Sequence, residues 1–197
     1  MAKALNKREK MMEETHDKLL TAAREYFGKY GYADTAMETF TSSIGLTRGA
    51  LYHHFGNKKG LFAEVVMQID TEIDEILQEI SNQEPDPWRA LYKRGVAYLQ
   101  HSLEPEFQQI LLKDAKAILG TELMTIQRRS MDSDIVLIEN GIKQGIIKSG
   151  SPRVLAIMLD GSLFESAFWI AEADSEVRLA ETLEGWRILL EGIKVPQ

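Results

Sequence analysis

The chain has 197 residues, which is long enough to bury a substantial core without disulfides. It contains no Cys, which excludes disulfides and thiolate metal sites, and its formal net charge is −7. An acidic protein is a poor partner for nucleic acid, because binding depends on neutralising phosphates. The charge is uneven, however: residues 1–60 carry 10 Lys+Arg against 7 Asp+Glu, whereas residues 61–197 carry 13 against 23. The N-terminal part alone therefore suits a polyanion.

No segment predicts export or a membrane span. The first ten residues are polar and basic with no apolar stretch behind them, and no later run approaches the roughly 20 apolar residues that cross a bilayer. We therefore expect a cytoplasmic protein with no membrane partner. Every extended segment has helical rather than alternating periodicity, so the expected fold class is all-α. Three parts are expected: a flexible basic tail at 1–14, a three-helix head at 15–62 and a helical body at 63–197.

The head begins with two helices. A helix over about 15–30 is expected to end at Gly31, because glycine is typical of the position after a helix C-terminus. Thr35 is then expected to cap a short second helix, with Glu38 three residues later completing a capping box. Gly45 breaks the chain again.

Two more helices follow the break. Thr47 is expected to cap a short third helix, whose Leu51 and Phe55 are assigned to the core. Asn57 caps a long fourth helix that can join two parts of the molecule. Its apolar residues step by three or four to about residue 81. They are Phe62, Val65, Ile69, Ile73, Ile76 and Ile80.

The body follows the break at Pro85 and Pro87, since two prolines so close together cannot sit inside a helix. Further helices are expected over about 88–103, 106–119, 122–147, 152–173 and 175–193. The last two are adjacent and amphipathic, so they can pack against their symmetry mates, which predicts a homodimer. Their apolar faces are Leu155, Met158, Leu159, Leu163, Ser166, Ala167 and Ile170, and Leu179, Leu183, Trp186, Leu190 and Ile193.

The segment 35–54 has the form of a helix-turn-helix. Two short helices joined by a tight turn, the second rich in small and hydrogen-bonding residues, are what the major groove of DNA admits. Arg48 can offer a bidentate fork to a guanine edge, and Gly49 keeps the backbone close to the groove. The other candidates for phosphate or base contacts are Thr47, Tyr52, His53 and Lys58.

On these residues the stretch from Leu19 to Phe62, above all TRGALYHHFGNKKGLF, resembles the DNA-binding domain of the TetR family of bacterial transcriptional regulators. The shared positions are Ala22, Phe27, Gly31, Thr35, Gly45, Arg48, Leu51, Tyr52, Phe55, Asn57, Lys58 and Leu61. The resemblance implies an all-helical homodimer that pairs through its last two helices and often holds a ligand pocket. Carried over residue by residue, it implies DNA contacts from Thr35, Thr47, Arg48, Tyr52, His53 and Lys58.

The second helix departs from the family pattern. Thr41 and Ile44 replace small residues, and Phe40 stands at a common Ile position. Altered packing between the second and third helices is expected.

Aromatic and thioether side chains between the head and the last helices suit a pocket for an apolar molecule, and equally suit an ordinary core. An acidic body favours a cationic or neutral effector. The effector-binding candidates are Tyr92, His101, Phe107, Met124, Arg128, Met131, Glu165 and Trp169.

The predicted function is a repressor that binds a palindromic operator and is released by a small, largely apolar effector. The first alternative is a ligand-independent regulator controlled by its abundance or by a protein partner. An all-α metalloenzyme ranks third, because Glu13 and His16 have a di-iron spacing without a second copy, and adjacent His53 and His54 point apart. No cofactor or metal is expected. Acidic pairs such as Asp70 and Asp74, or Asp132 and Asp134, are interpreted as the solvated faces of long helices.

Overall fold

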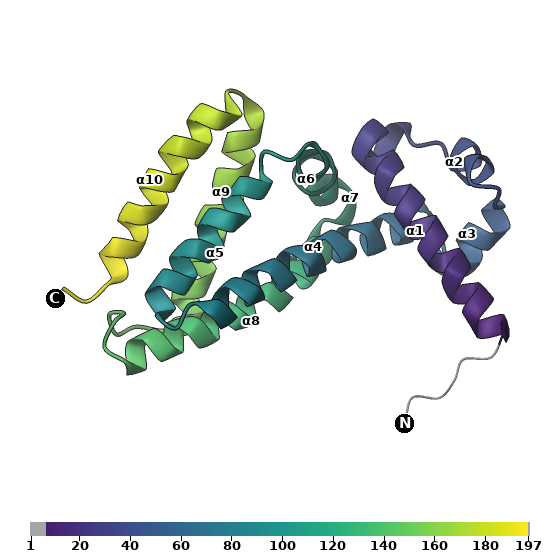
Figure 1. Cartoon of the computed structure of the whole chain (residues 1–197). Coiled ribbons are helices and arrows are strands. Elements are labelled where there is room, and N and C mark those ends of the chain that lie inside the picture. Colours follow the sequence, from purple (N-terminus) through teal and green to yellow (C-terminus); the bar gives the residue numbers. More distant parts are fainter. Residues whose placement is uncertain (1–6, 197) are drawn as a thin grey trace.

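The computed structural model describes residues 7–196, apart from the side chains at 124 and 127–130. Within that part of the chain every regular element is helical, and the extended pairing is limited to an isolated bridge between Ile147 and Lys194. The all-α prediction is confirmed. The elements are α1 (Lys7–Asp34), α2 (Met37–Ser43), α3 (Arg48–Phe55), α4 (Lys58–Gln83), α5 (Pro87–His101), α6 (Pro105–Phe107), the π-helix η1 (Gln108–Ala115), α7 (Lys116–Leu119), α8 (Thr121–Lys143), α9 (Pro152–Glu172) and α10 (Ser175–Ile193) (Figure 1).

Helices α1, α2 and α3 form a head around the first turns of α4 (Figure 1). Each turns an apolar stripe into a shared core, and Leu51 and Phe55 of α3 are buried there, as predicted. Phe40 of α2 is also fully buried, edge-to-face with Tyr26 at a centroid distance of 5.4 Å. The large residue in the second helix is therefore accommodated as an aromatic contact with α1.

Helix α1 begins at Lys7 and is therefore longer at its N-terminus than predicted. Residues 7–14 form its first turns, so the prediction of a flexible tail is wrong for them, while residues 1–6 lie outside the described part. Gly31 interrupts the helix with a φ of 76°, which confirms the predicted break. Glycine adopts this left-handed conformation without steric cost.

The caps of the head are partly as predicted. Thr47 Oγ1 accepts from Ala50 N at 3.2 Å, and Asn57 Oδ1 accepts from Gly60 N at 2.9 Å, so both predicted N-caps are confirmed. The capping box at Thr35 is wrong. Its hydroxyl instead donates to the Gly31 carbonyl at 2.7 Å, and α2 begins at Met37 without a side-chain cap.

Helix α4 leaves the head and runs into the body (Figure 1). Its predicted stripe is buried at Phe62, Val65, Ile69 and Ile73, but Ile76 is 44% exposed and neighbouring Leu77 is buried in its place. Leu77 lies one helical turn after Ile73, so the buried stripe continues along α4 where α5 and α8 pack on it, and Ile76 lies at its edge.

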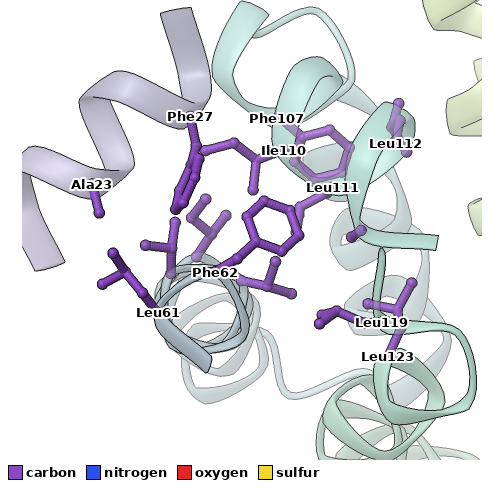
Figure 2. Close-up of a cluster of buried hydrophobic side chains, with 14 of the residues drawn as sticks. Ala23, Phe27, Leu61, Phe62, Phe107, Ile110, Leu111, Leu112, Leu119 and Leu123 are labelled. Carbon is purple, nitrogen blue, oxygen red and sulfur yellow. The ribbon is translucent and has the colours of Figure 1, made fainter. Parts of the chain in front are cut away.

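The single helix predicted over about 106–119 is three consecutive elements, α6, η1 and α7. The π-helical turns of η1 direct Ile110 and Leu111 into the core that also contains Phe27 and Phe62 of the head (Figure 2). One apolar cluster therefore runs from the head into the body, and a second, around Trp186 and Leu190, lies among α5, α8, α9 and α10.

The apolar faces predicted for dimerisation mostly face the protomer's own core. Leu159, Ala167, Ile170, Trp186 and Leu190 are buried there, so their assignment to an outer surface is wrong. Of the predicted residues, Met158 is exposed, at 66%. Other large apolar side chains on these two helices are exposed as well: Val154, Ile157, Trp169, Val177, Ile188 and Leu189.

Helix α9 is long and apolar enough to cross a bilayer by length and composition, although no such run was expected. Only 22% of its most apolar window is buried within the protomer. Apolar side chains of α9 therefore lie on two sides of the helix: some are buried in the protomer's core, and others are exposed on the outer surface.

Candidate nucleic-acid interface and ligand cavity

The exposed side of α3 is organised around Arg48. Its Nη2 donates to the Tyr52 hydroxyl at 2.9 Å, and the guanidinium carbon lies 5.6 Å from the centre of the Tyr52 ring. Both residues are one helical turn apart and exposed, so they form one polar patch on the surface. The contact restrains a long side chain and leaves guanidinium donors available to a ligand.

Gly49 and His53 lie on the same exposed helix. A Cβ placed on Gly49 would meet only Thr47 Oγ1, at 3.6 Å, so nothing inside the protein requires a glycine there. The imidazole rings of His53 and His54 lie next to each other, with their centroids 5.5 Å apart. The predicted contacts Thr47, Arg48, Gly49, Tyr52 and His53 thus share one surface.

Two predicted contacts are elsewhere. The side chain of Thr35 is 2% exposed and bonded inward, so it does not reach that surface. Lys58 Nζ lies 4.5 Å from the centre of the Tyr32 ring and donates to the Ala33 carbonyl at 3.3 Å. Burial lowers the pKa of Lys58. Its ammonium therefore ties the start of α4 to the end of α1.

Glu13 and His16 have the Glu-x-x-His spacing of a di-iron site. In the described part of the chain they do not come together with further carboxylates or histidines in a group that could hold a metal ion. His16 Nε2 instead lies 2.9 Å from Glu64 Oε2 of α4, and its ring stacks on Phe55 at 4.8 Å. Burial lowers the pKa of His16, but hydrogen bonds to Asp17 and Glu64 outweigh burial, and the net direction is upward. His16 is therefore a packing residue that joins α1, α3 and α4.

A cavity of about 530 Å³ lies in the body among α4, α5, α8 and α9. This volume is within the usual range for small-molecule sites. Its walls are mainly apolar and aromatic, and they include Leu111 of η1. The apolar and aromatic lining residues are Val66, Ile73, Leu77, Leu91, Tyr98, Leu111, Leu123, Met131, Ile157, Leu159, Leu163, Phe164 and Trp186.

The polar side of the cavity is built around Arg94, which is buried on α5. Its Nε lies 2.8 Å from Asp134 Oδ1 of α8, and its Nη2 donates to Ser133 Oγ at 2.6 Å. Asp160 of α9 hydrogen-bonds Asp134, and burial together with the charge of Asp134 raises the pKa of Asp160 to about 7. Burial also raises the pKa of Asp134. The interpretation of Asp134 as a solvated carboxylate is therefore wrong.

Of the predicted effector residues, Met131 alone is shown to line this cavity. Tyr92 stacks on Trp88, His101 pairs with Glu104 at 2.8 Å, and Phe107 is buried in the core. Glu165 is exposed, and Trp169 borders a second hollow between α9 and α10. The predictions at Met124 and Arg128 fall on side chains outside the described part. Sequence reasoning missed Arg94 and Asp160, although a charge inside an apolar helix such as Asp160 is a signal that could have found them.

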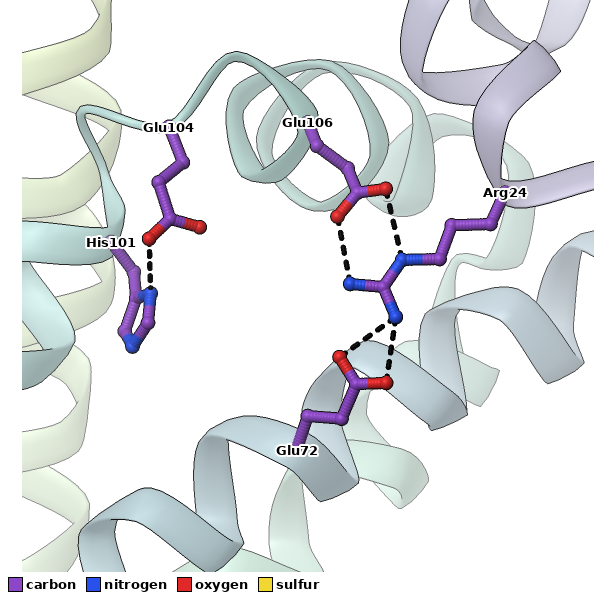
Figure 3. Close-up of polar contacts among 5 residues, drawn as sticks. All are labelled: Arg24, Glu72, His101, Glu104 and Glu106. Carbon is purple, nitrogen blue, oxygen red and sulfur yellow. Dashed lines mark hydrogen bonds and ion pairs between the residues drawn. The ribbon is translucent and has the colours of Figure 1, made fainter. Parts of the chain in front are cut away.

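A salt-bridge cluster connects the head to the body (Figure 3). Arg24 of α1 contacts two carboxylates. Its Nε and Nη2 donate to the two oxygens of Glu106 on α6 at 2.9 and 2.8 Å in a bidentate pair, and its Nη1 lies 2.7 Å from both oxygens of Glu72 on α4. The Tyr32 backbone N–H also donates to Asp114 of η1 at 2.8 Å. The head is thus held to the α6–η1 segment by directional contacts as well as by the shared apolar core.

An exposed helix-turn-helix on a larger helical body that encloses a cavity defines a helix-turn-helix transcriptional regulator. Residues 19–65 match the family described as bacterial regulatory proteins, tetR family, and residues 88–193 match the tetracyclin repressor-like C-terminal domain. The chain belongs to the TetR family of bacterial transcriptional regulators.

Solved and curated relatives agree with this assignment. A TetR-family transcriptional regulator from Pectobacterium atrosepticum is 48% identical, with a TM-score of 0.87 over 98% of this chain and 99% of that one. The probable acrEF/envCD operon repressor of Escherichia coli K12 is 33% identical over 50% of this chain, and the match spans 46% of that protein. The repressor BepR of Brucella suis is 28% identical over 85% of this chain and 76% of its own.

Proposed function

We propose that this protein is a cytoplasmic, homodimeric repressor that binds a palindromic operator through α3 and leaves it when a small molecule occupies the body cavity. The observation that carries the proposal is the position of η1. Leu111 of η1 lines the cavity, while Ile110 and Asp114 of the same element contact the head. An occupant of the cavity is therefore one helix away from the DNA-binding unit.

Helix α3 supports the DNA-binding part of the proposal. Arg48 and Tyr52 present a cation and a hydroxyl on an exposed helix, and Gly49 lies between them with no packing demand. A contact with the major groove of DNA explains a glycine at position 49, since a residue without a side chain lets the backbone approach DNA closely. Thr47 and His53 flank this patch and are proposed to contact phosphates.

The outer surface of α9 and α10 supports the dimer. It exposes Ile157, Met158, Ile188 and other large apolar side chains, and apolar surface of this extent favours an interface. Gly161 and Gly185 also lie in these helices, and a Cβ at either position would meet nothing within 4 Å. Mid-helix glycines cost stability relative to alanine, so close approach of a partner helix gives them a reason.

Release follows if the occupied cavity favours another position of the head. The ligand must bind one head position better than the other, because equal affinity shifts nothing. The contacts that must change between the two positions are those of η1 with α1, and those of Arg24 with Glu72 of α4 and Glu106 of α6. Two recognition helices then no longer match half-sites one DNA turn apart, about 34 Å.

The test begins by selecting operator fragments from a random DNA pool and measuring affinity by fluorescence anisotropy. Arg48→Ala is expected to weaken operator binding about 10- to 100-fold and random DNA much less, because a bidentate base contact contributes roughly 1–3 kcal/mol of discrimination. Lys143→Ala, an exposed cation on α8, is the control and should change neither. Equal losses on both DNAs for Arg48→Ala would contradict base recognition by α3.

A thermal-shift panel of lipophilic compounds tests the ligand. A compound held at 100 times its Kd should add about 2.7 kcal/mol to the free energy of unfolding and release the operator. Compounds that stabilise the protein yet leave operator affinity unchanged would favour regulation without a ligand.

A further inference from the structure

We infer that the body cavity takes an organic cation with an apolar body, whose charged group lies among the carboxylates of Asp74, Asp134 and Asp160. This inference deepens the proposed function, because it names the class of effector for the same cavity. It is argued from the charges that line the cavity, from the partners those charges already have, and from the walls opposite them.

The lining of the cavity is rich in carboxylates. Asp74 comes from α4, Asp134 from α8 and Asp160 from α9, whereas the cations among the described lining residues are Arg94 and Arg153. Arg153 is exposed at the start of α9, so Arg94 is the buried cation of this described lining. Within the described lining, three carboxylates from three helices thus surround one buried cation.

Arg94 is already committed to the protein. It is 3% exposed, its Nη1 donates to the Leu77 carbonyl at 3.1 Å and to Ser81 Oγ at 2.9 Å, and its Nη2 donates to Ser133. Its Nε faces Asp134. An anionic ligand would have to compete for these donors, and it would also meet the surrounding carboxylates.

Among the described residues, Asp74 and Asp160 form no ion pair of their own, although the charge of Arg94 acts on Asp160. Asp74 Oδ1 is buried and has no hydrogen-bond partner, although it lies on the cavity wall. Asp160 shares a hydrogen bond with Asp134, which requires a proton between the two carboxyl groups at neutral pH. Both arrangements cost free energy in a buried site. A ligand cation would replace the proton between Asp134 and Asp160, and it would pair with the unsatisfied oxygen of Asp74.

The opposite walls suit the rest of such a ligand. Tyr98, Phe164 and Trp186 bring aromatic rings to the cavity, and aromatic faces attract ammonium groups that have lost their water. The aliphatic side chains around them accept an alkyl or aryl body. The lining therefore combines the two contacts that an amphiphilic cation needs.

Three probes of equal chain length test the charge preference by isothermal titration calorimetry on the full chain: decyltrimethylammonium, 1-decanol and decanoate, all below their micelle concentrations. We expect the cation to bind at least about tenfold more tightly than the alcohol, and decanoate to bind most weakly. The same cation should release the operator. Equal or tighter binding of decanol or decanoate would overturn the inference.

Isosteric variants locate the charge. Asp74→Asn and Asp160→Asn should each weaken decyltrimethylammonium binding about tenfold and leave 1-decanol binding unchanged. Glu165→Gln is the control, because Glu165 is exposed on the same helix as Asp160 and does not line the cavity. Loss of binding to both probes would indicate a collapsed cavity, which thermal unfolding would reveal, and an unchanged cation affinity in both variants would overturn the inference.

Binding of this permanent cation should also depend on pH. Among the described residues, Asp134 of α8 and Arg94 of α5 act on Asp160 directly, and the Tyr98 hydroxyl lies near it. Asp70 and Asp74 of α4 and Arg153 of α9 line the same cavity. Because the pKa of Asp160 is raised to about 7, the cation must displace a proton below that pH. Its affinity should rise about tenfold or more from about pH 5.5 to pH 8.5, while that of 1-decanol stays constant.

The two proposals fail separately. If 1-decanol or decanoate binds as well as the cation and releases the operator, the cation preference is wrong and the ligand-released repressor stands. If the cation binds through Asp160 but operator affinity does not change, the cavity preference stands and the proposed release is wrong. If none of the three probes binds, the cavity is not a site for amphiphiles and the inference is overturned.

Discussion

Two glycines of the head are under opposite constraints. A Cβ on Gly60, in the first turn of α4, would lie 2.1 Å from the Phe55 carbonyl oxygen, a backbone atom that cannot move without shifting α3. Gly49 on the exposed side of α3 meets no such obstacle. Gly60 is therefore required by the fold, whereas Gly49 is free to serve DNA binding.

Matched alanine variants separate these roles. Gly60→Ala should lower the free energy of unfolding by roughly 1–3 kcal/mol, as expected for overpacking. Gly49→Ala should keep or slightly raise it, since alanine favours helices, and should weaken operator binding. Denaturant unfolding and anisotropy measure both. Normal operator affinity in Gly49→Ala would remove Gly49 from the interface.

Asp160 links stability to pH in the direction opposite to a salt-bridged carboxylate. Its folded pKa is raised to about 7 from an ordinary value of 3.8, so the folded state binds more protons between these values. Its contribution is complete below about pH 4 and is lost as the pH rises through 7.

Asp160→Asn removes this dependence. The variant should melt at a higher temperature than the wild type at pH 8 and at nearly the same temperature near pH 4, with a gain of at most about 4 kcal/mol. Differential scanning calorimetry at both pH values measures the difference. A constant offset across the range would mean that Asp160 does not hold its proton in the folded state.

At the scale of elements, the contact between the head and α6–η1 decides how the cavity communicates with DNA. Arg24 contacts Glu72 and Glu106, carboxylates on two different elements (Figure 3). Exposed ion pairs contribute little, but a guanidinium that pairs bidentately with one carboxylate and contacts a second one fixes orientation. Its main role is therefore to position α1 relative to the body.

Arg24→Met tests this role while keeping much of the side chain's apolar packing. Amides over about 20–34 of α1 should exchange with deuterium about tenfold faster, whereas those of α10 should not change. Lys93→Met, which removes the Lys93–Glu84 pair on α5, is the control. Uniformly faster exchange would indicate a general loss of stability rather than a loosened head.

At the scale of the whole molecule, the sequence predicted what depends on local chemistry. The caps at Thr47 and Asn57 follow from side chains that act within one turn. The predicted N-cap at Thr35 is wrong because the Gly31 carbonyl, exposed by the helix break, accepts the hydrogen bond of the Thr35 hydroxyl. The sequence suggested an apolar pocket but not its polar wall, because Asp74, Arg94, Asp134 and Asp160 meet only after α4, α5, α8 and α9 pack.

The dimer surface shows the same limit. Helix α9 is apolar around most of its circumference, so its periodicity does not say which side faces the protomer's core. The face that the sequence pattern assigned to the interface is therefore mostly the inward one, and the exposed residues other than Met158 were found only from the packing.

Ile188→Glu on α10 tests the surface that the structure exposes. This side chain is 58% exposed, so a charge there should not unfold the protomer but should split the proposed dimer. Light scattering should give the mass of a single chain, about 22.3 kDa, and operator affinity should fall because two half-sites are no longer bound together. Val136→Glu, equally exposed on α8, should remain dimeric.

Trp186 borders both the cavity and the hollow between α9 and α10, and it packs against Gly95 so closely that a Cβ there would lie 2.3 Å from the indole. The indole of Trp186 thus separates the body cavity from the hollow between α9 and α10. A molecule arriving on either side alters the polarity around the same chromophore. The chain has three tryptophans. In a variant that keeps Trp186 and carries Phe at the other two positions, intrinsic emission consequently offers a label-free optical signal in which occupancy and subunit association can be followed in a single sample.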